Sequence, residues 1–395
     1  MRKLRATAPY ALLQAMTWGI YAVLLTYSSN FLIDRGFNGN GISLVLGVST
    51  ALSIALQLFL AEQISRRPKL RAYGVSLVVG GVLLLGCVLL FAKGMTAVLA
   101  FVLACVLFQC MPALVNSMGV DAMEKGAPIN YGLARGSGSL GYSLLSYGVG
   151  LLVTRHGTVA IPMVACVVVS VLVASVLWFH GSVERGLPET EKKAAPTKQR
   201  GFLRNHKLFT LLLTGGVLLM FSHNLVTNFS LQIMQTKGGG AAEQGMTNAI
   251  AAIMELPAMF LFTYFLRLMR CERWVKLSGI FFAVKVFAML LAPSVEWVYA
   301  AQLFQCCGYA LYTVSSVYYV ENMIPGETVR AQSYLASSHS IGALLATSTG
   351  GVLCEQLSAQ AMMVVSIVAG VLGTVITVYA VTRQSKMAQS EISER

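Results

Sequence analysis

The chain has 395 residues, of which 56% are hydrophobic and 11% charged, and its formal net charge is +13. Soluble domains carry about 25% charged residues, so this composition excludes a soluble globular protein. The mean hydropathy of +0.69 indicates an integral membrane protein instead.

Long apolar runs recur along the whole chain, and a helix needs about 20 such residues to cross the hydrocarbon core of a bilayer. The pattern predicts an all-α integral membrane protein with twelve transmembrane helices. The predicted spans are 8–33, 42–63, 72–92, 96–120, 136–154, 158–179, 208–232, 246–266, 274–292, 297–320, 333–352 and 360–382.

One long polar segment, rich in charge, Pro and Gly, separates the first six predicted spans from the last six. We therefore predict two pseudo-symmetric six-helix bundles. The predicted domains are an N-terminal bundle over 1–180, a cytoplasmic central loop over 181–207, a C-terminal bundle over 208–383 and a cytoplasmic tail over 384–395.

The two halves also resemble each other in sequence. The segments that begin at Gly41 and Gly245 each start with glycine, cross the membrane, end in a basic loop and re-enter. Repeats of this kind build many secondary transporters, in which the substrate site lies between the repeats near the bilayer midplane.

Basic residues are distributed unequally between the two sides of the membrane. With a cytoplasmic N-terminus, only Arg35, Lys93, Arg155 and Lys237 lie on the opposite side, and only Lys285 lies deep within a span. The positive-inside rule then places both termini in the cytoplasm, and we predict a multi-pass protein of the cell membrane. The basic excess therefore reflects topology. It implies contact with the lipid bilayer and its acidic headgroups, and no nucleic-acid partner.

Motifs for nucleotide or metal chemistry are missing or out of context. The segment GSGSLG, residues 136–141, matches G-x-G-x-x-G, but a dinucleotide site needs a preceding strand and a later carboxylate. Small residues that let membrane helices approach closely are the favoured interpretation. The eight cysteines have no metal-ligand or redox spacing. No P-loop or hydrolase motif occurs, so we predict no cofactor, no metal site and no enzyme activity.

Polar side chains within the predicted spans form faces at helical spacing. One face contains Gln14, Thr17, Trp18 and Tyr21; another pairs His223 with Thr227 and Asn224 with Asn228; a third contains Gln302, Gln305, Tyr309, Tyr312 and Ser316. These groups either bond neighbouring helices or line a water-filled cavity. Several such faces in one bundle favour a cavity, and neutral polar groups with aromatic rings suit a hydroxylated solute.

Glu255 and Lys285 are the ionisable residues deepest in the predicted spans. A charge at the bilayer centre costs about 2.5–3.5 kcal/mol on insertion scales, and pairing offsets part of this cost. The pair serves either proton coupling or only the stability of the fold. Pro257 follows Glu255 by two residues and removes a backbone hydrogen bond there.

These features resemble the major facilitator superfamily, and within it the lactose permease-like group of sugar and nucleoside proton symporters. The segment LFLAEQISRRPKL is similar to the loop 2–3 signature, which implies a gating role for Glu62, Arg66 and Arg67, although Ser65 replaces the usual glycine.

The same resemblance implies roles for residues elsewhere in the chain. It places Asp121 on the sugar-binding carboxylate, Arg135 on its paired arginine, and Tyr142 on the tryptophan that stacks on the sugar. It also places Glu255 on the helix 8 glutamate and Lys285 on the helix 9 arginine. Asn224 and Thr227 depart from the pattern, because they stand where the permease has aspartates.

We therefore predict a secondary transporter that couples protons to the uptake of a small polar solute, a sugar, oligosaccharide or nucleoside, by alternating access. It would act as a monomer. One alternative is a proton-antiport exporter of amphipathic compounds, and another is a non-transporting sensor or membrane enzyme. The predicted substrate-binding residues are Asp121, Arg135, Tyr142, Trp18, Tyr21, Asn224, Gln305 and Tyr309, with Glu255 and Lys285 for proton coupling.

Overall fold

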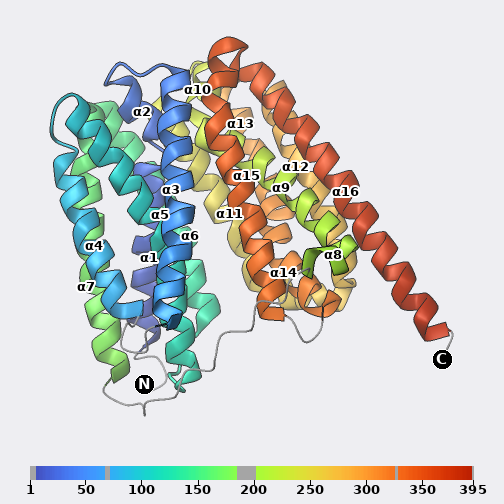
Figure 1. The fold of residues 1–395 in the computed structure, drawn as a ribbon. Helices are drawn as coiled ribbons and strands as arrows, with labels where there is room; N and C mark the ends of the chain where they lie inside the picture. The colour runs from blue at the N-terminus through green and yellow to red at the C-terminus, as the bar shows by residue number, and fades with distance from the viewer. Residues whose placement is uncertain (1–5, 67–71, 185–201, 325–327, 394–395) are drawn as a thin grey trace. The chain divides into compact units, whose positions relative to one another are not determined.

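The computed structural model describes residues 6–66, 72–184, 202–324 and 328–393, and every regular element in these ranges is a helix (Figure 1). Contacts divide the chain into two compact units. Unit 1 comprises Met1–Ala195 and Gly238–Ile253, and unit 2 comprises Pro196–Lys237 and Met254–Arg395. These limits differ from the predicted domain limits, because the first part of one helix, Ala241–Leu268, belongs to unit 1 and the remainder to unit 2.

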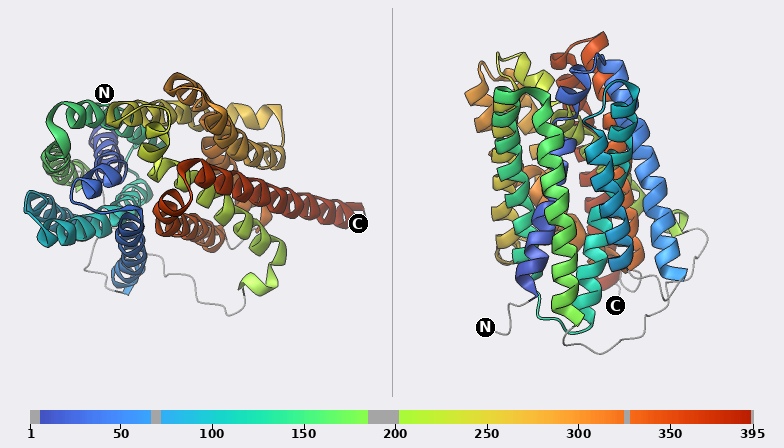
Figure 2. Two further views of the ribbon diagram at one scale, coloured as in Figure 1. Left: turned by 90° about the horizontal axis from the view of Figure 1, so that it is seen from above. Right: turned by 90° about the vertical axis from the view of Figure 1, so that its left-hand side faces the viewer.

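Unit 1 is built on long helices that run side by side, blue to green in Figures 1 and 2. In hydrocarbon each backbone polar group needs an internal partner, so apolar stretches of this length form helices. Its elements are α1 (Thr7–Leu24), α2 (Ser28–Ile33), α3 (Gly39–Arg66), α4 (Ala72–Leu89), α5 (Met95–Glu124), α6 (Tyr131–His156), the 3-10 turn η2 (Gly157–Val159) and α7 (Ala160–Glu184), with the start of α11 (Ala241–Leu268).

Unit 2 contains the remaining helices. Its last helix runs to Ser393, so the predicted tail is helical as far as the structure describes it, and in Figure 1 this helix extends beyond its neighbours. The elements are α8 (Phe202–Asn205), α9 (Lys207–Asn228), α10 (Ser230–Gln235), α12 (Cys271–Leu291), α13 (Val295–Ala301), the π-helix η3 (Cys306–Ala310), α14 (Leu311–Met323), α15 (Thr328–Gln356) and α16 (Ala359–Ser393).

Each predicted span coincides with a helix or a short run of helices. By length and composition, nine stretches of the described residues can cross a membrane, and one of them, Leu133–Val183, contains most of both α6 and α7. The other two predicted spans correspond to α13–η3–α14, which is interrupted, and to α15, which is rich in Ser, Thr and Gly. Most of the predicted central loop, residues 185–201, lies outside the described residues.

Glycines bring α6 close to α1 within unit 1. A Cβ atom on Gly138 would lie 2.5 Å from the Trp18 ring, and one on Gly141 would lie 2.5 Å from the backbone oxygen of Ala15. Close backbone approach between membrane helices requires such small residues. The packing interpretation of the GSGSLG segment is therefore confirmed.

The first part of α11 packs on α6 and on the residues that follow α1, and its backbone approaches that of α6 closely. A Cβ atom on Gly245 would lie 2.5 Å from the backbone oxygen of Ser146, and the amide of Gln244 donates to the backbone oxygen of Thr26 at 2.7 Å. The hydroxyl of Ser143 donates to the backbone oxygen of Ala249 at 3.0 Å. This segment is therefore held by hydrogen bonds as well as by packing.

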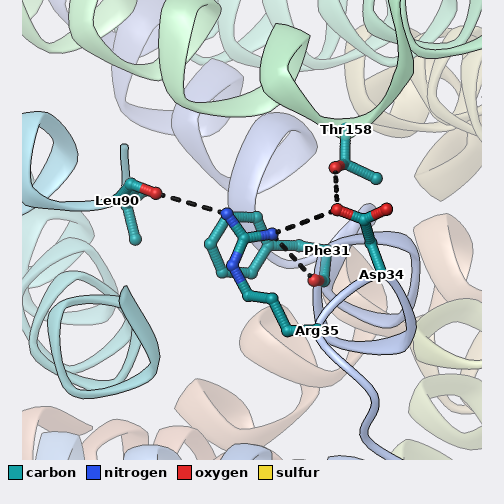
Figure 3. A network of polar contacts seen from close by, with 5 residues as sticks. All are labelled: Phe31, Asp34, Arg35, Leu90 and Thr158. Carbon is teal, nitrogen blue, oxygen red and sulfur yellow. Dashed lines mark hydrogen bonds and ion pairs between the residues drawn. The ribbon is translucent and has the colours of Figure 1, made fainter. Parts of the chain in front are cut away.

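Arg35 belongs to a network of polar contacts that joins three parts of unit 1 (Figure 3). Its guanidinium donates to the backbone oxygens of Phe31 at 3.1 Å and Leu90 at 3.3 Å, and its central carbon lies 3.4 Å from the centroid of the Phe31 ring. Asp34 lies 3.7 Å from the guanidinium and accepts a hydrogen bond of 2.6 Å from Thr158. Burial lowers the pKa of Arg35, and the charge of Asp34 opposes this effect.

We expect Arg35→Ala to destabilise unit 1 by about 2 kcal/mol, because hydrogen bonds to a charged group contribute about 1.5–3 kcal/mol. The measurement is thermal unfolding of the purified protein in detergent. Arg155→Ala is the matched control, since Arg155 lies in the last turn of α6 and is exposed. Equal unfolding temperatures for the two variants would contradict a stabilising role for this network.

Candidate functional site

Three polar side chains from three helices of unit 2 meet within the apolar spans. The ammonium group of Lys285 on α12 donates to Oε1 of Gln305 at 2.7 Å, and Nε2 of Gln305 donates to Oε1 of Glu255 on α11 at 3.0 Å. Lys285 is only 7% exposed, whereas Glu255 is partly exposed. The two charged groups are therefore linked through the amide of Gln305.

A small cavity borders this arrangement. Its wall includes Lys285 and Gln305, together with His223 of α9 and Tyr309 of η3. The rings of His223 and Tyr309 stack with centroids 4.0 Å apart and an interplanar angle of 13°. The cavity has room for about one water molecule. In this conformation it therefore presents an aromatic pair and a charged group, but it does not accommodate a sugar-sized molecule.

The helix that carries Gln305 and Tyr309 is interrupted at the site. Backbone bonds from Gln302 to Tyr299 and from Gln305 to Gln302 are turn-like, and the π-helix η3 follows directly. A Cβ atom on Gly308 would lie 3.3 Å from the backbone of Phe281 in α12, so the glycine permits a close approach. Single π-helical turns inside α-helices are frequent at functional sites.

Pro257 does not interrupt α11, which continues as a helix through it. The proline removes one backbone hydrogen bond a half-turn after Glu255.

On α9, the side chains of Asn224 and Thr227 donate to backbone oxygens one turn earlier in the same helix. Asn224 bonds the oxygen of Met220 at 2.8 Å, and Thr227 bonds that of His223 at 2.9 Å.

The predicted polar residues of unit 1 form two separate groups. Asp121 lies in the last turn of α5 and pairs with Lys125 at 2.8 Å, and the structure shows no ion pair between Asp121 and Arg135 among the residues that it describes. The guanidinium carbon of Arg135 lies 4.5 Å from the centroid of a Trp18 ring. The pairing that the resemblance implied for Asp121 and Arg135 is therefore replaced by a contact of each with another residue.

The aromatic residues of unit 1 extend from Arg135 along α1. Trp18 and Tyr21 pack with ring centroids 5.4 Å apart, and Tyr21 meets Phe108 of α5 edge to face at 4.7 Å. The hydroxyl of Tyr142 lies 2.9 Å from that of Thr26. Arg135, Trp18 and Tyr21 thus form one continuous group, and Tyr142 bonds Thr26, which follows the end of α1.

The predicted gating residues lie at the edge of the described structure. Glu62 is exposed near the end of α3, the side chain of Arg66 is not described, and Arg67 lies outside the described residues.

His223 is not among the predicted site residues, although it lies on one of the predicted polar faces. The signal was present in the sequence as a histidine one turn before Thr227 in an apolar span. Only the fold shows that this face meets Tyr309 and Lys285. Further into unit 2, Nε2 of His339 and the hydroxyl of Tyr312 are buried polar atoms without a hydrogen-bond partner.

The sequence of this chain is similar to those of known membrane transporters. A sequence model of the MFS_1 like family matches residues 11–384. A protein from Deinococcus radiodurans, described as a candidate sugar efflux transporter, is 25% identical over 132 residues, or 33% of this chain. The match spans about a third (34%) of that relative's length.

Two solved structures share the fold. The crystal structure of the nucleoside transporter NupG matches with a TM-score of 0.75 at 12% identity, and that of a point mutant of NupG with 0.76 at 14%. Both matches cover 96% of this chain and 99% of the other. At this identity the likeness establishes the fold alone, and it confirms the predicted twelve-helix architecture.

Proposed function

Because this chain belongs to the MFS_1 like family of membrane transporters, we propose that it couples proton movement to the uptake of a small polar solute, a sugar, oligosaccharide or nucleoside, by alternating access. The observation that carries this proposal is the linkage of Lys285, Gln305 and Glu255 within apolar spans.

The position of Glu255 supports proton coupling. A carboxylate in a span is costly when ionised, and a nearby cation reduces that cost. Glu255 is also only partly buried. A group whose two protonation states are close in free energy can change state when its surroundings change. Such a change is what coupling to a proton gradient requires.

The polar and aromatic side chains at the candidate sites of unit 1 and unit 2 support a hydroxylated substrate. In unit 2, Gln305, Tyr309 and Asn224 supply hydrogen-bonding groups, with His223 stacked on Tyr309. In unit 1, Arg135 supplies a cation beside the Trp18 ring. Aromatic faces pack against the apolar face of a sugar or a nucleobase, while amides and guanidinium groups bond its polar atoms.

The names of the similar proteins agree with a sugar or a nucleoside as the solute. They are compatible with both uptake and export. NupG is a nucleoside transporter, and the relative from Deinococcus radiodurans is described in terms of sugar efflux. Export by proton antiport is therefore the second candidate. We further propose that the protein resides in the cell membrane as a monomer with both termini in the cytoplasm, which agrees with the distribution of basic residues.

The test is solute-driven proton movement in proteoliposomes that contain a pH-sensitive dye. We expect an inward gradient of lactose or uridine to acidify the lumen, because a symporter carries protons in the direction of the solute whichever way it is inserted. Alkalinisation on addition of lactose, uridine or ethidium would favour the exporter. No response to any of the three would contradict both candidates, with empty liposomes as the control.

A further inference from the structure

We propose that Gln305 is a positioning residue that sets how readily Glu255 gains and loses its proton, an inference that rests on the proposed proton coupling. This role is additional to the predicted role of Gln305 as a direct substrate contact. It follows from how the amide lies between Lys285 and Glu255.

The chemistry of the three groups determines the orientation of the amide. An ammonium group only donates hydrogen bonds, and an ionised carboxylate only accepts them. The amide oxygen therefore faces Lys285 at 2.7 Å, and the amide nitrogen faces Glu255 at 3.0 Å. Rotating the amide by half a turn would oppose both charges. The observed orientation stabilises the ionised form of Glu255, because a hydrogen bond donated to a carboxylate favours its charge.

Titratable groups surround this linkage on several elements. Lys285 lies on α12, Cys306 and Tyr309 lie in η3, and His223 on α9 interacts electrostatically with both Lys285 and His339 of α15. Lys285 interacts electrostatically with Glu255, and Gln305 bonds Lys285 directly. The amide of Gln305 thus connects the carboxylate of Glu255 to the ammonium group of Lys285 through two hydrogen bonds.

The backbone around Gln305 departs from regular α-helical geometry. Gln305 lies between a turn-like segment and the π-helix η3, where backbone hydrogen bonds do not follow the α-helical pattern. Rewinding of such a segment displaces its side chains relative to the neighbouring helices. A change of winding at η3 would therefore alter the bonds to Lys285 and Glu255 together.

The test is infrared titration of the purified, lipid-reconstituted protein, which needs no substrate. The carbonyl band of protonated Glu255 is identified as the band that Glu255→Gln removes. We expect Gln305→Leu to move the titration midpoint of this band to higher pH by about one unit, since one hydrogen bond to a charged group contributes about that much. Leucine has a similar size, so it keeps Lys285 from closing on Glu255.

Gln302→Leu is the matched control. Gln302 is buried on the same interrupted segment, but its amide donates to Val298 at 3.3 Å and to the sulfur of Met289 at 3.6 Å. We expect its midpoint to equal that of the wild-type protein. Gln305→Asn, whose shorter amide cannot span both partners, replaces Gln305→Leu if the latter fails to fold.

Two results would overturn the proposal: an unchanged midpoint in a folded Gln305 variant, or an equal shift in Gln302→Leu. Because the infrared readout does not depend on transport, its outcome is separate from that of the proteoliposome experiment. If Gln305→Leu moves the titration midpoint as expected but the proteoliposomes show no solute-driven proton movement, the positioning role stands and the proposed function is rejected.

Discussion

Glu255→Gln is expected to abolish accumulation of labelled lactose or uridine against a concentration gradient, while exchange of the same solute persists. Glutamine keeps the shape of the side chain and its bond with Gln305, but it cannot titrate. Without a group that is protonated in one part of the cycle and ionised in another, a proton gradient has no means of driving the solute. The measurement compares uptake and exchange by the same proteoliposomes.

The structural interpretation of Glu255 predicts a different pattern. If the carboxylate only neutralises Lys285, Glu255→Gln strands a buried cation and destabilises the fold, and adding Lys285→Met restores stability. Glu243→Gln is the matched control, because Glu243 lies on the same helix and caps its start through the backbone nitrogen of Gly240 at 2.7 Å. Accumulation by Glu255→Gln at the wild-type level would reject proton coupling through this residue.

Arg135→Ala is expected to abolish detectable binding of lactose and uridine, with membrane expression unchanged. Its guanidinium lies over Trp18 and so presents hydrogen-bond donors beside an aromatic face. Loss of charge-assisted bonds of about 1.5–3 kcal/mol each corresponds to roughly 10- to 100-fold or more in affinity. Isothermal calorimetry on the purified protein measures the change.

The control for Arg135 is another cation near the same end of unit 1. Lys125 pairs with Asp121 at 2.8 Å, and we expect Lys125→Ala to leave binding within about twofold, since surface ion pairs contribute about 0–1 kcal/mol. Binding by Arg135→Ala within twofold of the wild-type protein would remove Arg135, and with it the Trp18 face, from the substrate site.

The architecture followed from local properties of the chain. A run of about 20 apolar residues can form all its backbone hydrogen bonds in lipid only as a helix. Each span could therefore be predicted from its own residues. For the same reason Glu255 and Lys285 stood out, because an ionisable residue inside such a run is unusual wherever the helix lies. The span predicted over 333–352 corresponds to α15, which is rich in Ser, Thr and Gly and is not among the nine stretches of the described residues that can cross a membrane by length and composition.

The bonding of the site was decided by the tertiary structure. Helical spacing placed Gln305 and Tyr309 on one face, but which residues meet that face depends on how α9, α11 and α12 pack. The link from Lys285 through Gln305 to Glu255 joins residues far apart in the sequence, and the stack of His223 on Tyr309 does the same.

In unit 1, Asp121 and Arg135 each contact a residue other than the one that the resemblance implied. Asp121 bonds Lys125, one turn away on the same segment, and Arg135 is drawn to the ring of Trp18 because Gly138 allows α1 and α6 to approach closely. The sequence by itself therefore determined the helices, their number and the unusual charges within them, since those depend on transfer from water to lipid residue by residue. Only the tertiary structure decided the partners of those charges, because hydrogen bonds and ring contacts require particular atoms of distant helices to lie within a few ångströms of each other.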